Sequence, residues 1–286
     1  MTEPEITEPD IYPDLTNEQY HADPVKGGSL SSSGARKLIP PSCPALFFHE
    51  RANPQPYKAA FDFGHAAHRA VLTEGEIIEE IDAKDWRTND AKAQRDAARA
   101  AGRIPLLTKD AKIVEEMAAA LRAHPIASMV FAPGTGTPEQ SLVWRDEQTG
   151  VMCRARIDWL PNKADGRRLI ISDYKTARTV EPRALARAFY DHGYHQQEDW
   201  YLDGVRSLGL DDDPQFVFIC QEKTAPYLVT VADLSDDAKR VGRARNKWAR
   251  ETYAQCVESG EWPPFSADIE LIDLPAWAKT DQGMTE

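Results

Sequence analysis

The feature that most constrains this chain is a change of hydrophobic pattern at residue 139, where helical periodicity gives way to alternation of apolar and polar residues. The segments EQSLVWRD and VMCRARIDWL have the two-residue period of strands, and EQTG between them contains a turn glycine, which predicts a hairpin. The segment RRLIISDYKT, after the turn PNKADG, predicts a third strand with an apolar centre. The chain must therefore bury at least one sheet.

The second half of the chain extends this sheet. Helical patterns occupy PRALARAFYDHG and YHQQEDWYLDGVRSLG, two more strands are predicted in PQFVFICQEK and PYLVTVAD, and a long helix runs from Ser235 to about Gly260. The order of three strands, two helices, two strands and a helix predicts an α/β fold, with a mixed central sheet flanked by helices.

The first half is predicted to be mostly helical. Residues 1–28 are rich in Pro, Asp and Glu and are expected to be irregular. Ser31 to Ser33 offer N-caps for a short helix that Pro40 and Pro41 stop, and Pro44 can open the next helix. In FDFGHAAHRAVL, a third predicted helix, Phe61, His65 and His68 share one face.

Residues 76–131 are expected to form a helical insertion after a short extended piece, EIIEEI, with Asn89 and Thr108 as helix caps. With 286 residues, one elaborated domain fits better than two minimal ones. We expect this domain to span residues 29–266 and residues 267–286 to form a C-terminal tail.

Composition excludes several classes of protein. No apolar run approaches the roughly 20 residues of a membrane span, and the acidic, polar N-terminus lacks the features of a secretory signal, so we expect a cytoplasmic protein with no membrane partner. The cysteines form no CxxC pair and are expected to be free, reduced thiols rather than zinc or Fe–S ligands. They are Cys43, Cys153, Cys220 and Cys256.

The formal net charge of −12 argues against a protein that coats nucleic acid non-specifically. A local basic strip could still contact phosphates, and the last predicted helix carries one. Its members are Lys239, Arg240, Arg243, Arg245, Lys247 and Arg250. A solvated helix face is the alternative interpretation.

Candidate chemistry lies where two predicted strands end. Asp158 ends one strand, Asp173 lies near the end of the next, and Lys175 follows two residues later, on the same side of the strand as Asp173. Two carboxylates, with the Tyr174 carbonyl, are oxygen ligands suited to Mg²⁺. An ammonium group beside the metal can orient an attacking water and offset charge on a reacting phosphate.

The triplet Asp-x-Lys is not specific by itself. It also occurs in four polar stretches, at Asp82–Lys84, Asp90–Lys92, Asp110–Lys112 and Asp237–Lys239. Only Asp173–Lys175 follows an apolar strand that is preceded by another strand ending in Asp. The alternative interpretation is a surface ion pair at a strand end.

From about Tyr20 to Phe265 the chain resembles the phage and prophage recombination exonucleases related to exonuclease VIII, a branch of the RecB-like PD-(D/E)XK nucleases with a restriction-endonuclease-like fold. The resemblance is carried, in order, by SLSSSGARKL, PSCPALFF, FGHAAHRAVL, EQSLVWRDEQTGVMCRARIDWL, IISDYKTA, GYHQQEDWYLDG, FVFICQEKTAPY and ESGEWPPF.

The resemblance implies further site residues. The helical Gly-x-x-x-His motif corresponds to Gly64 and His68, and the His68 imidazole is expected to complete the metal site. His65 is assigned no role. Glu139 matches an acidic position that could help to bind a second metal or position water, or could simply face solvent. Tyr194 and Gln197 match a Tyr-x-x-Gln motif that could position a scissile phosphate or water, or could be ordinary amphipathic pattern.

The implied function is a Mg²⁺-dependent exodeoxyribonuclease, with Mn²⁺ also possible, that digests linear double-stranded DNA from 5′ to 3′. The 3′-ended strand would pass to a single-strand annealing protein for recombination, and relatives form rings around DNA. Arg36, Lys37 and Arg51 are candidates for holding the 5′ end of the DNA, with ordinary surface charge as the alternative. One alternative is a non-catalytic DNA-end adaptor, but retention of Asp158, Asp173 and Lys175 argues against it. The other is an Fe–S-type nuclease, but this sequence lacks the clustered cysteines of that type.

Overall fold

The computed structural model describes residues 5–53, 60–72, 78–164 and 166–275. The strands are β1 (Asp10–Tyr12), β2 (Leu30–Ser31), β3 (Ile78–Ile81), β4 (Ile104–Leu107), β5 (Gly136–Arg145), β6 (Met152–Pro161), β7 (Ile170–Ala177), β8 (Gln215–Glu222) and β9 (Val229–Ala232). The helices are α1 (Asn17–His21), α2 (Ser32–Leu38), α3 (Pro44–Ala52), α4 (Ala60–Leu72), α5 (Asn89–Ala100), α6 (Thr108–Ala123), α7 (Ala127–Val130), α8 (Pro182–Asp191), α9 (Tyr194–Ser207) and α10 (Asp236–Ser259).

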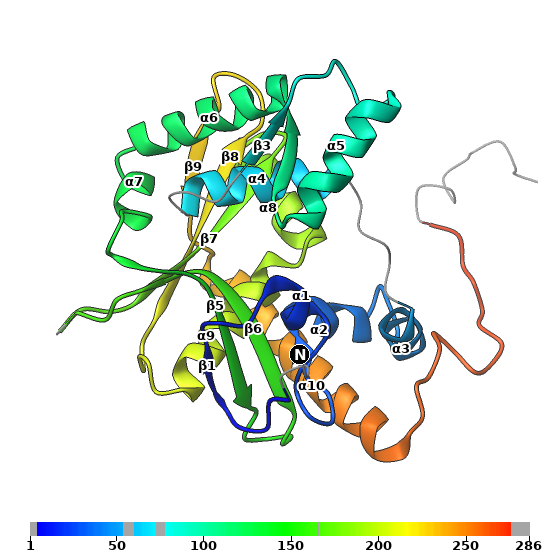
Figure 1. Cartoon of the computed structure of the whole chain (residues 1–286). Coiled ribbons are helices and arrows are strands. Elements are labelled where there is room, and N and C mark those ends of the chain that lie inside the picture. Colours follow the sequence, from blue (N-terminus) through cyan, green and yellow to red (C-terminus); the bar gives the residue numbers. More distant parts are fainter. Residues whose placement is uncertain (1–4, 54–59, 73–77, 165, 276–286) are drawn as a thin grey trace, which may run out of the picture.

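The central sheet is mixed. Its strand order is β1-β5-β6-β7-β8-β9, and β2 pairs with β6 outside this path. β7 and β8 are parallel, as are β2 and β6, whereas the other pairs are antiparallel. The hairpin, the third strand and the two later strands predicted from the sequence are therefore confirmed, and the fold is α/β with helices on the sheet (Figure 1).

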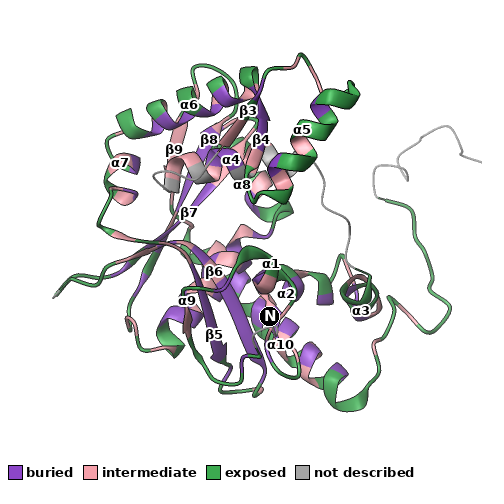
Figure 2. Cartoon of the chain, viewed as in Figure 1, coloured by how far each residue is buried: buried purple, intermediate pink, exposed green. Residues whose placement is uncertain are grey.

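Both faces of the sheet are covered. One face packs against α2, α9 and α10 around the buried rings of Trp144, Trp200 and Phe218. On the other face, α4, α6 and α7 cover Trp159, Tyr174 and other apolar residues of the later strands. Figure 2 shows β5 and β6 as buried strands, and α6 as buried on one side and exposed on the other. Among the described residues, no helix is both long and apolar enough to cross a membrane.

The N-terminal segment differs from the expectation that residues 1–28 are irregular. β1 pairs antiparallel with β5, and Thr16 caps α1 by a capping box with Gln19. Leu15 and Tyr20 are buried in a third apolar cluster against strands β5 and β6. The high content of Pro, Asp and Glu predicts irregular structure, but a few apolar residues of this segment pack against the sheet.

The insertion is mainly helical, as predicted, but contains a parallel strand pair, β3 and β4. The strand β4 was missed because it is only IPLL, short and beginning beside a glycine-containing turn. Helix α5 is capped by Thr88 rather than Asn89, and α6 begins at Thr108 itself without a side-chain cap. The predicted positions of Phe61 and His65 on their helix face lie outside the described side chains.

Candidate active site

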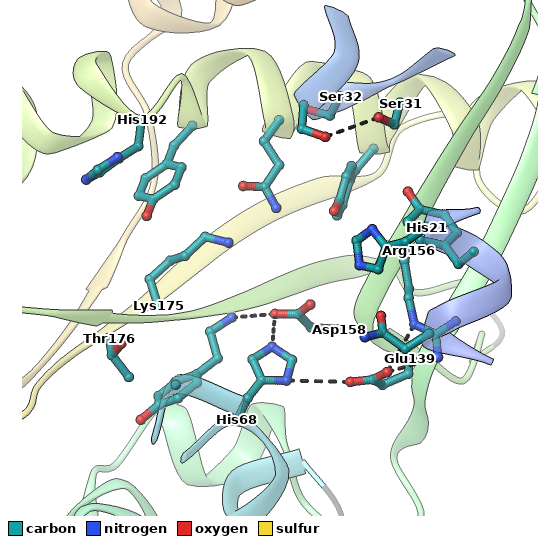
Figure 3. Close-up of a pocket in the computed structure, with 18 of the residues that line it drawn as sticks. His21, Ser31, Ser32, His68, Glu139, Arg156, Asp158, Lys175, Thr176 and His192 are labelled. Carbon is teal, nitrogen blue, oxygen red and sulfur yellow. Dashed lines mark hydrogen bonds and ion pairs between the residues drawn. The ribbon is translucent and has the colours of Figure 1, made fainter. Parts of the chain in front are cut away.

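The floor of one cleft brings together side chains from β6, β7 and α4. The cleft has a volume of about 720 Å³. Asp158 Oδ2 lies 2.7 Å from His68 Nε2 and accepts a hydrogen bond of 3.0 Å from the backbone N–H of Tyr174. Figure 3 shows the His68 ring between Asp158 and Glu139. The backbone of β7 is therefore hydrogen-bonded to the side chain of Asp158 on β6.

Asp173 and Lys175 share one side of β7, as their spacing predicted. The Lys175 ammonium lies 2.6 Å from Asp173 Oδ2, in an ion pair. The intervening Tyr174 side chain points the other way, where its hydroxyl donates a 2.6 Å hydrogen bond to Gln221 Oε1. Asp173 is only 1% exposed, so its charge is balanced by protein groups rather than by water.

Helix α9 completes the site from the opposite wall. Gln197 Nε2 donates a hydrogen bond of 2.6 Å to Asp173 Oδ1. The Tyr194 ring lies 5.0 Å from the Lys175 ammonium, in cation–π geometry. Both residues therefore face the cleft, as their three-residue spacing predicted, and contact the residues of β7.

The two aspartates have opposite pKa shifts. Burial and the neighbouring charge of Asp158 raise the pKa of Asp173 to about 6, against the opposing charge of Lys175. Burial also acts to raise the pKa of Asp158, but His68, Lys175 and the Tyr174 N–H outweigh it and lower that pKa. His68 and Lys175 therefore only partly neutralise the two carboxyl groups of Asp158 and Asp173.

The donor set fits a divalent cation. Two Mg²⁺ ligands at about 2.1 Å and at right angles lie roughly 3.0 Å apart, and His68 Nε2 and Asp158 Oδ2 are 2.7 Å apart. In the described part of the chain, no three His, Cys, Asp or Glu side chains are already grouped as metal ligands. Asp173 faces Lys175 and Gln197 instead.

Comparison with known families identifies the domain. Residues 31–275 match the family described as a PDDEXK-like domain of unknown function, DUF3799. The chain belongs to this family. The expectation of a PD-(D/E)XK nuclease fold is therefore confirmed, whereas the closer resemblance to exonuclease VIII remains a prediction.

A solved structure from Eubacterium rectale, described as a "putative exonuclease", supports the same fold for this PDDEXK-like domain. Its TM-score is 0.57 at 12% sequence identity, and the match covers 95% of this chain and 97% of the other. No curated protein sequence matches the chain.

The candidate DNA contacts of the PDDEXK-like domain separate into two groups. Arg36 lines the cleft, where it packs over Gly193, a residue with φ of +67° that a Cβ atom would bring into collision with the arginine. Among the described residues, no acidic group pairs with Arg36. Arg51 lies elsewhere, bound to Asp23 Oδ2 and to the Tyr253 hydroxyl, each at 3.0 Å. Lys37 pairs with Glu50 and does not line the cleft.

The basic residues of α10 do not form a free strip. Lys239 pairs with Glu198 and Asp233, and Arg250 pairs with Asp146 and Asp203. The other pairs are Arg240 with Asp237, Arg243 with Asp199, Arg245 with Gln196 and the Pro40 carbonyl, and Lys247 with Glu251. The sequence shows the cations but not the acids from outside α10 that pair with Lys239, Arg243 and Arg250.

The four cysteines are buried free thiols, as the sequence predicted.

Sequence reasoning missed one charged residue of the site, Arg156, which lines the cleft and pairs with Glu139. Its signal was its place two residues before Asp158 on the same strand, which did not distinguish it from Arg154.

Proposed function

We propose that this chain is a metal-dependent nuclease that hydrolyses phosphodiester bonds of DNA. The observation that carries the proposal is that Asp158, Lys175 and His68 line one cleft, with the buried Asp173 paired to Lys175. Membership of a PDDEXK-like family supports it, because two acids and a lysine on adjoining strands define that motif.

In this proposal Asp158, Asp173, His68 and the Tyr174 carbonyl hold one or two Mg²⁺ ions, with Mn²⁺ as a substitute. Such an ion supplies Lewis acidity and a more acidic bound water. Oxygen ligands suit Mg²⁺, whereas an imidazole ligand also suits Mn²⁺. Asp158 and His68 already share a contact of 2.7 Å, so they need little movement to bind the same ion.

The remaining residues act on water and phosphate. The Lys175 ammonium, held between Asp173 and the Tyr194 ring, would help to orient water and offset negative charge on the attacked phosphate. Gln197 keeps Asp173 in place through its 2.6 Å hydrogen bond. These contacts hold the reacting groups rigidly before DNA arrives, which reduces the reorganisation needed during hydrolysis.

The finer proposal is digestion of linear double-stranded DNA from its ends, 5′ to 3′, leaving a 3′-ended strand for an annealing protein. It is supported by the resemblance to the recombination exonucleases and by the description of the Eubacterium rectale protein. A ring-shaped oligomer would let an acidic chain stay on DNA by enclosure rather than by bulk charge.

The test compares linear duplexes labelled at the 5′ or the 3′ end, and a closed circular duplex, with Mg²⁺ or with a chelator. We expect Mg²⁺-dependent loss of the 5′ label first and no attack on the circle. Lys175→Ala should lower the rate by at least roughly 100-fold, because it removes charge stabilisation at the reacting phosphate. Lys239→Ala is the matched control, since Lys239 also pairs with a buried carboxylate but lies outside the cleft.

Three outcomes would change the proposal. Equal activity of Lys175→Ala and wild type would remove the assigned role of Lys175. Cutting of the circle would make the enzyme an endonuclease. End binding without Mg²⁺-dependent cutting would indicate an adaptor that recruits another protein to DNA ends.

A further inference from the structure

Glu139 and Arg156 form an ion pair beside the proposed metal ligands. Arg156 Nε and Nη2 lie 3.0 and 2.9 Å from Glu139 Oε2. The other carboxylate oxygen, Oε1, lies 3.7 Å from His68 Nδ1. Glu139 therefore presents one oxygen to an arginine and the other to the histidine ring, on the side of the ring opposite Asp158 (Figure 3).

The backbone at Glu139 is unusual for its residue type. Glu139 has φ of +54°, in the left-handed region that costs energy for a residue with a Cβ atom. The strand ladder pairs Pro138 with Trp159 and Gln140 with Ile157, so it skips Glu139 directly across from Asp158. Such strain persists where surrounding contacts hold it, and it concentrates at functional sites.

Arg156 is itself held on several sides. Its Nη1 donates hydrogen bonds to the Leu15 carbonyl at 2.7 Å and to Ser141 Oγ at 2.8 Å. Its guanidinium also lies 5.9 Å from the centre of the Tyr20 ring. The N-terminal segment thus fixes Arg156, and Arg156 fixes the Glu139 carboxylate.

A histidine that binds a metal through Nε2 must carry its proton on Nδ1. A carboxylate that accepts this Nδ1–H fixes the tautomer and the ring orientation, and it makes the other nitrogen a better ligand. Glu139 Oε1 lies on that side of His68. The other oxygen, Oε2, is held by Arg156. At 3.7 Å, Oε1 needs only a small movement to accept the Nδ1–H.

We propose that Glu139 and Arg156 are a positioning pair that orients His68 for metal binding, and that Glu139 is not itself a metal ligand. This inference rests on the proposed metal-dependent function. Arg156 acts through Glu139, and Glu139 acts through His68.

The first test measures Mn²⁺ binding by titration calorimetry without DNA. Glu139→Gln removes the charge at nearly constant size and should weaken Mn²⁺ binding by about tenfold or more. In a double-mutant cycle, Glu139→Gln should cost nothing further in the His68→Ala protein, and Arg156→Gln should cost nothing further in the Glu139→Gln protein. An equal loss with and without His68 would make Glu139 an independent ligand and overturn the inference.

Asp23→Asn is the matched control. Asp23 also has a positive φ, +60°, and its carboxylate pairs at 2.8 Å with Arg154, on the same strand as Arg156. It makes no contact with His68. Asp23→Asn should therefore lower the melting temperature as Glu139→Gln does, while leaving Mn²⁺ affinity within about twofold of wild type. A loss of Mn²⁺ affinity equal to that of Glu139→Gln would show that only general stability was lost, and would overturn the inference.

A second measurement covers the case in which His68→Ala binds Mn²⁺ too weakly to titrate. In ¹⁵N-histidine-labelled protein saturated with Mg²⁺, the His68 Nδ1 proton should exchange with water about tenfold faster in Glu139→Gln than in wild type. The same exchange rate in both would overturn the inference.

Failure of the inference and failure of the proposed function have different signatures. A wild-type protein that neither binds Mn²⁺ nor cuts DNA would overturn both. A wild-type protein that binds and cuts, together with an unchanged Mn²⁺ affinity in Glu139→Gln, would overturn only the positioning role.

Discussion

At the scale of single residues, Asp158 and Asp173 show how neighbours decide the charge of two buried carboxyl groups. Asp158 has an imidazole and a backbone N–H as partners, which outweigh burial and keep its pKa low. Asp173 feels the Asp158 charge as well as burial, and its pKa is about 6. A bound cation would take over the balancing of charge that protons and Lys175 provide here.

Mg²⁺ should therefore stabilise the folded chain. A ligand that binds only the folded state raises stability with its concentration, by about 2.7 kcal/mol at 100 times its dissociation constant. We expect the melting temperature of the wild type to rise with Mg²⁺ and that of Asp158→Asn to stay constant. Calcium-free differential scanning calorimetry with increasing Mg²⁺ measures both, and an equal rise in the variant would remove Asp158 from the metal site.

We expect Arg36 to be the residue of the cleft that contacts a DNA phosphate. It is half-buried without an acidic partner in the described ranges, and burial lowers its pKa, partly offset by Tyr194 and Tyr201. Arg36→Gln should raise KM for linear DNA by roughly tenfold or more, the value of a charge-assisted hydrogen bond, with Mn²⁺ affinity unchanged. Arg51→Gln should leave KM unchanged, and steady-state kinetics of the two variants that showed the reverse would contradict the assignment.

At the scale of elements, consecutive residues of α9 contact two different parts of the molecule, the active site and α10. Gln197 points to Asp173 on β7, whereas Glu198 points to α10 and lies 3.4 Å from the Lys239 ammonium. Glu198 is 2% exposed, so its carboxylate depends on Lys239 rather than on water to balance its charge. Helix α9 therefore contributes one residue to the active site and the next to the interface with α10.

Glu198 should make stability depend on pH. Burial raises its pKa from 4.5 to about 7, with the charges of Asp233 and Asp199 adding to this and Lys239 opposing it. Between pH 4.5 and about pH 7, Glu198 holds a proton in the folded state that it has lost in the unfolded state. The contribution of Glu198 to the free energy of unfolding is therefore largest below pH 4.5 and falls as the pH rises to about 7. The loss amounts to at most roughly 3 kcal/mol.

Urea unfolding at pH 5 and pH 8 tests this effect. Glu198→Gln should reduce the difference between the two pH values and be more stable than wild type at pH 8. An unchanged difference in the variant would mean that other groups cause the pH dependence.

The elements that the sequence predicted well are those with a strong local signal. The β5–β6 hairpin and helix α10 follow from periodicity, with a turn glycine for the hairpin and Ser235 as the cap of α10. The pairing of Asp173 with Lys175 follows from strand alternation. Partners distant in sequence do not follow from such signals. His68 reaches Asp158 across 90 positions, and only the family resemblance pointed to it.

At the scale of the whole molecule, the N-terminal segment belongs to the folded core. Contacts from Arg154 reach Ser29 and Asp23, and a contact from Arg156 reaches the Leu15 carbonyl. The far C-terminal part of the described chain behaves oppositely, since Ile269 and Leu271 are almost fully exposed. The two ends therefore contribute differently to stability.

Two deletions test this difference. Removing residues 1–13 takes away β1 and uncovers part of the third apolar cluster, so the melting temperature should fall by several degrees. Removing residues 267–286 should change it little, because the described part of this range is exposed. Thermal unfolding followed by circular dichroism gives both values, and equal shifts would contradict the assignment of the N-terminal segment to the core.

The ion pairs of α10 have a consequence for how binding should respond to salt. Each of these cations already has a protein partner and would neutralise few phosphates. Binding would therefore release few of the counterions that are condensed on the nucleic acid. The logarithm of the association constant should then fall only gently with the logarithm of KCl concentration, with a slope set by the few cations that face the cleft. An acidic enzyme of this kind would bind a polyanion through the few cations of one cleft, and not through attraction over a broad surface.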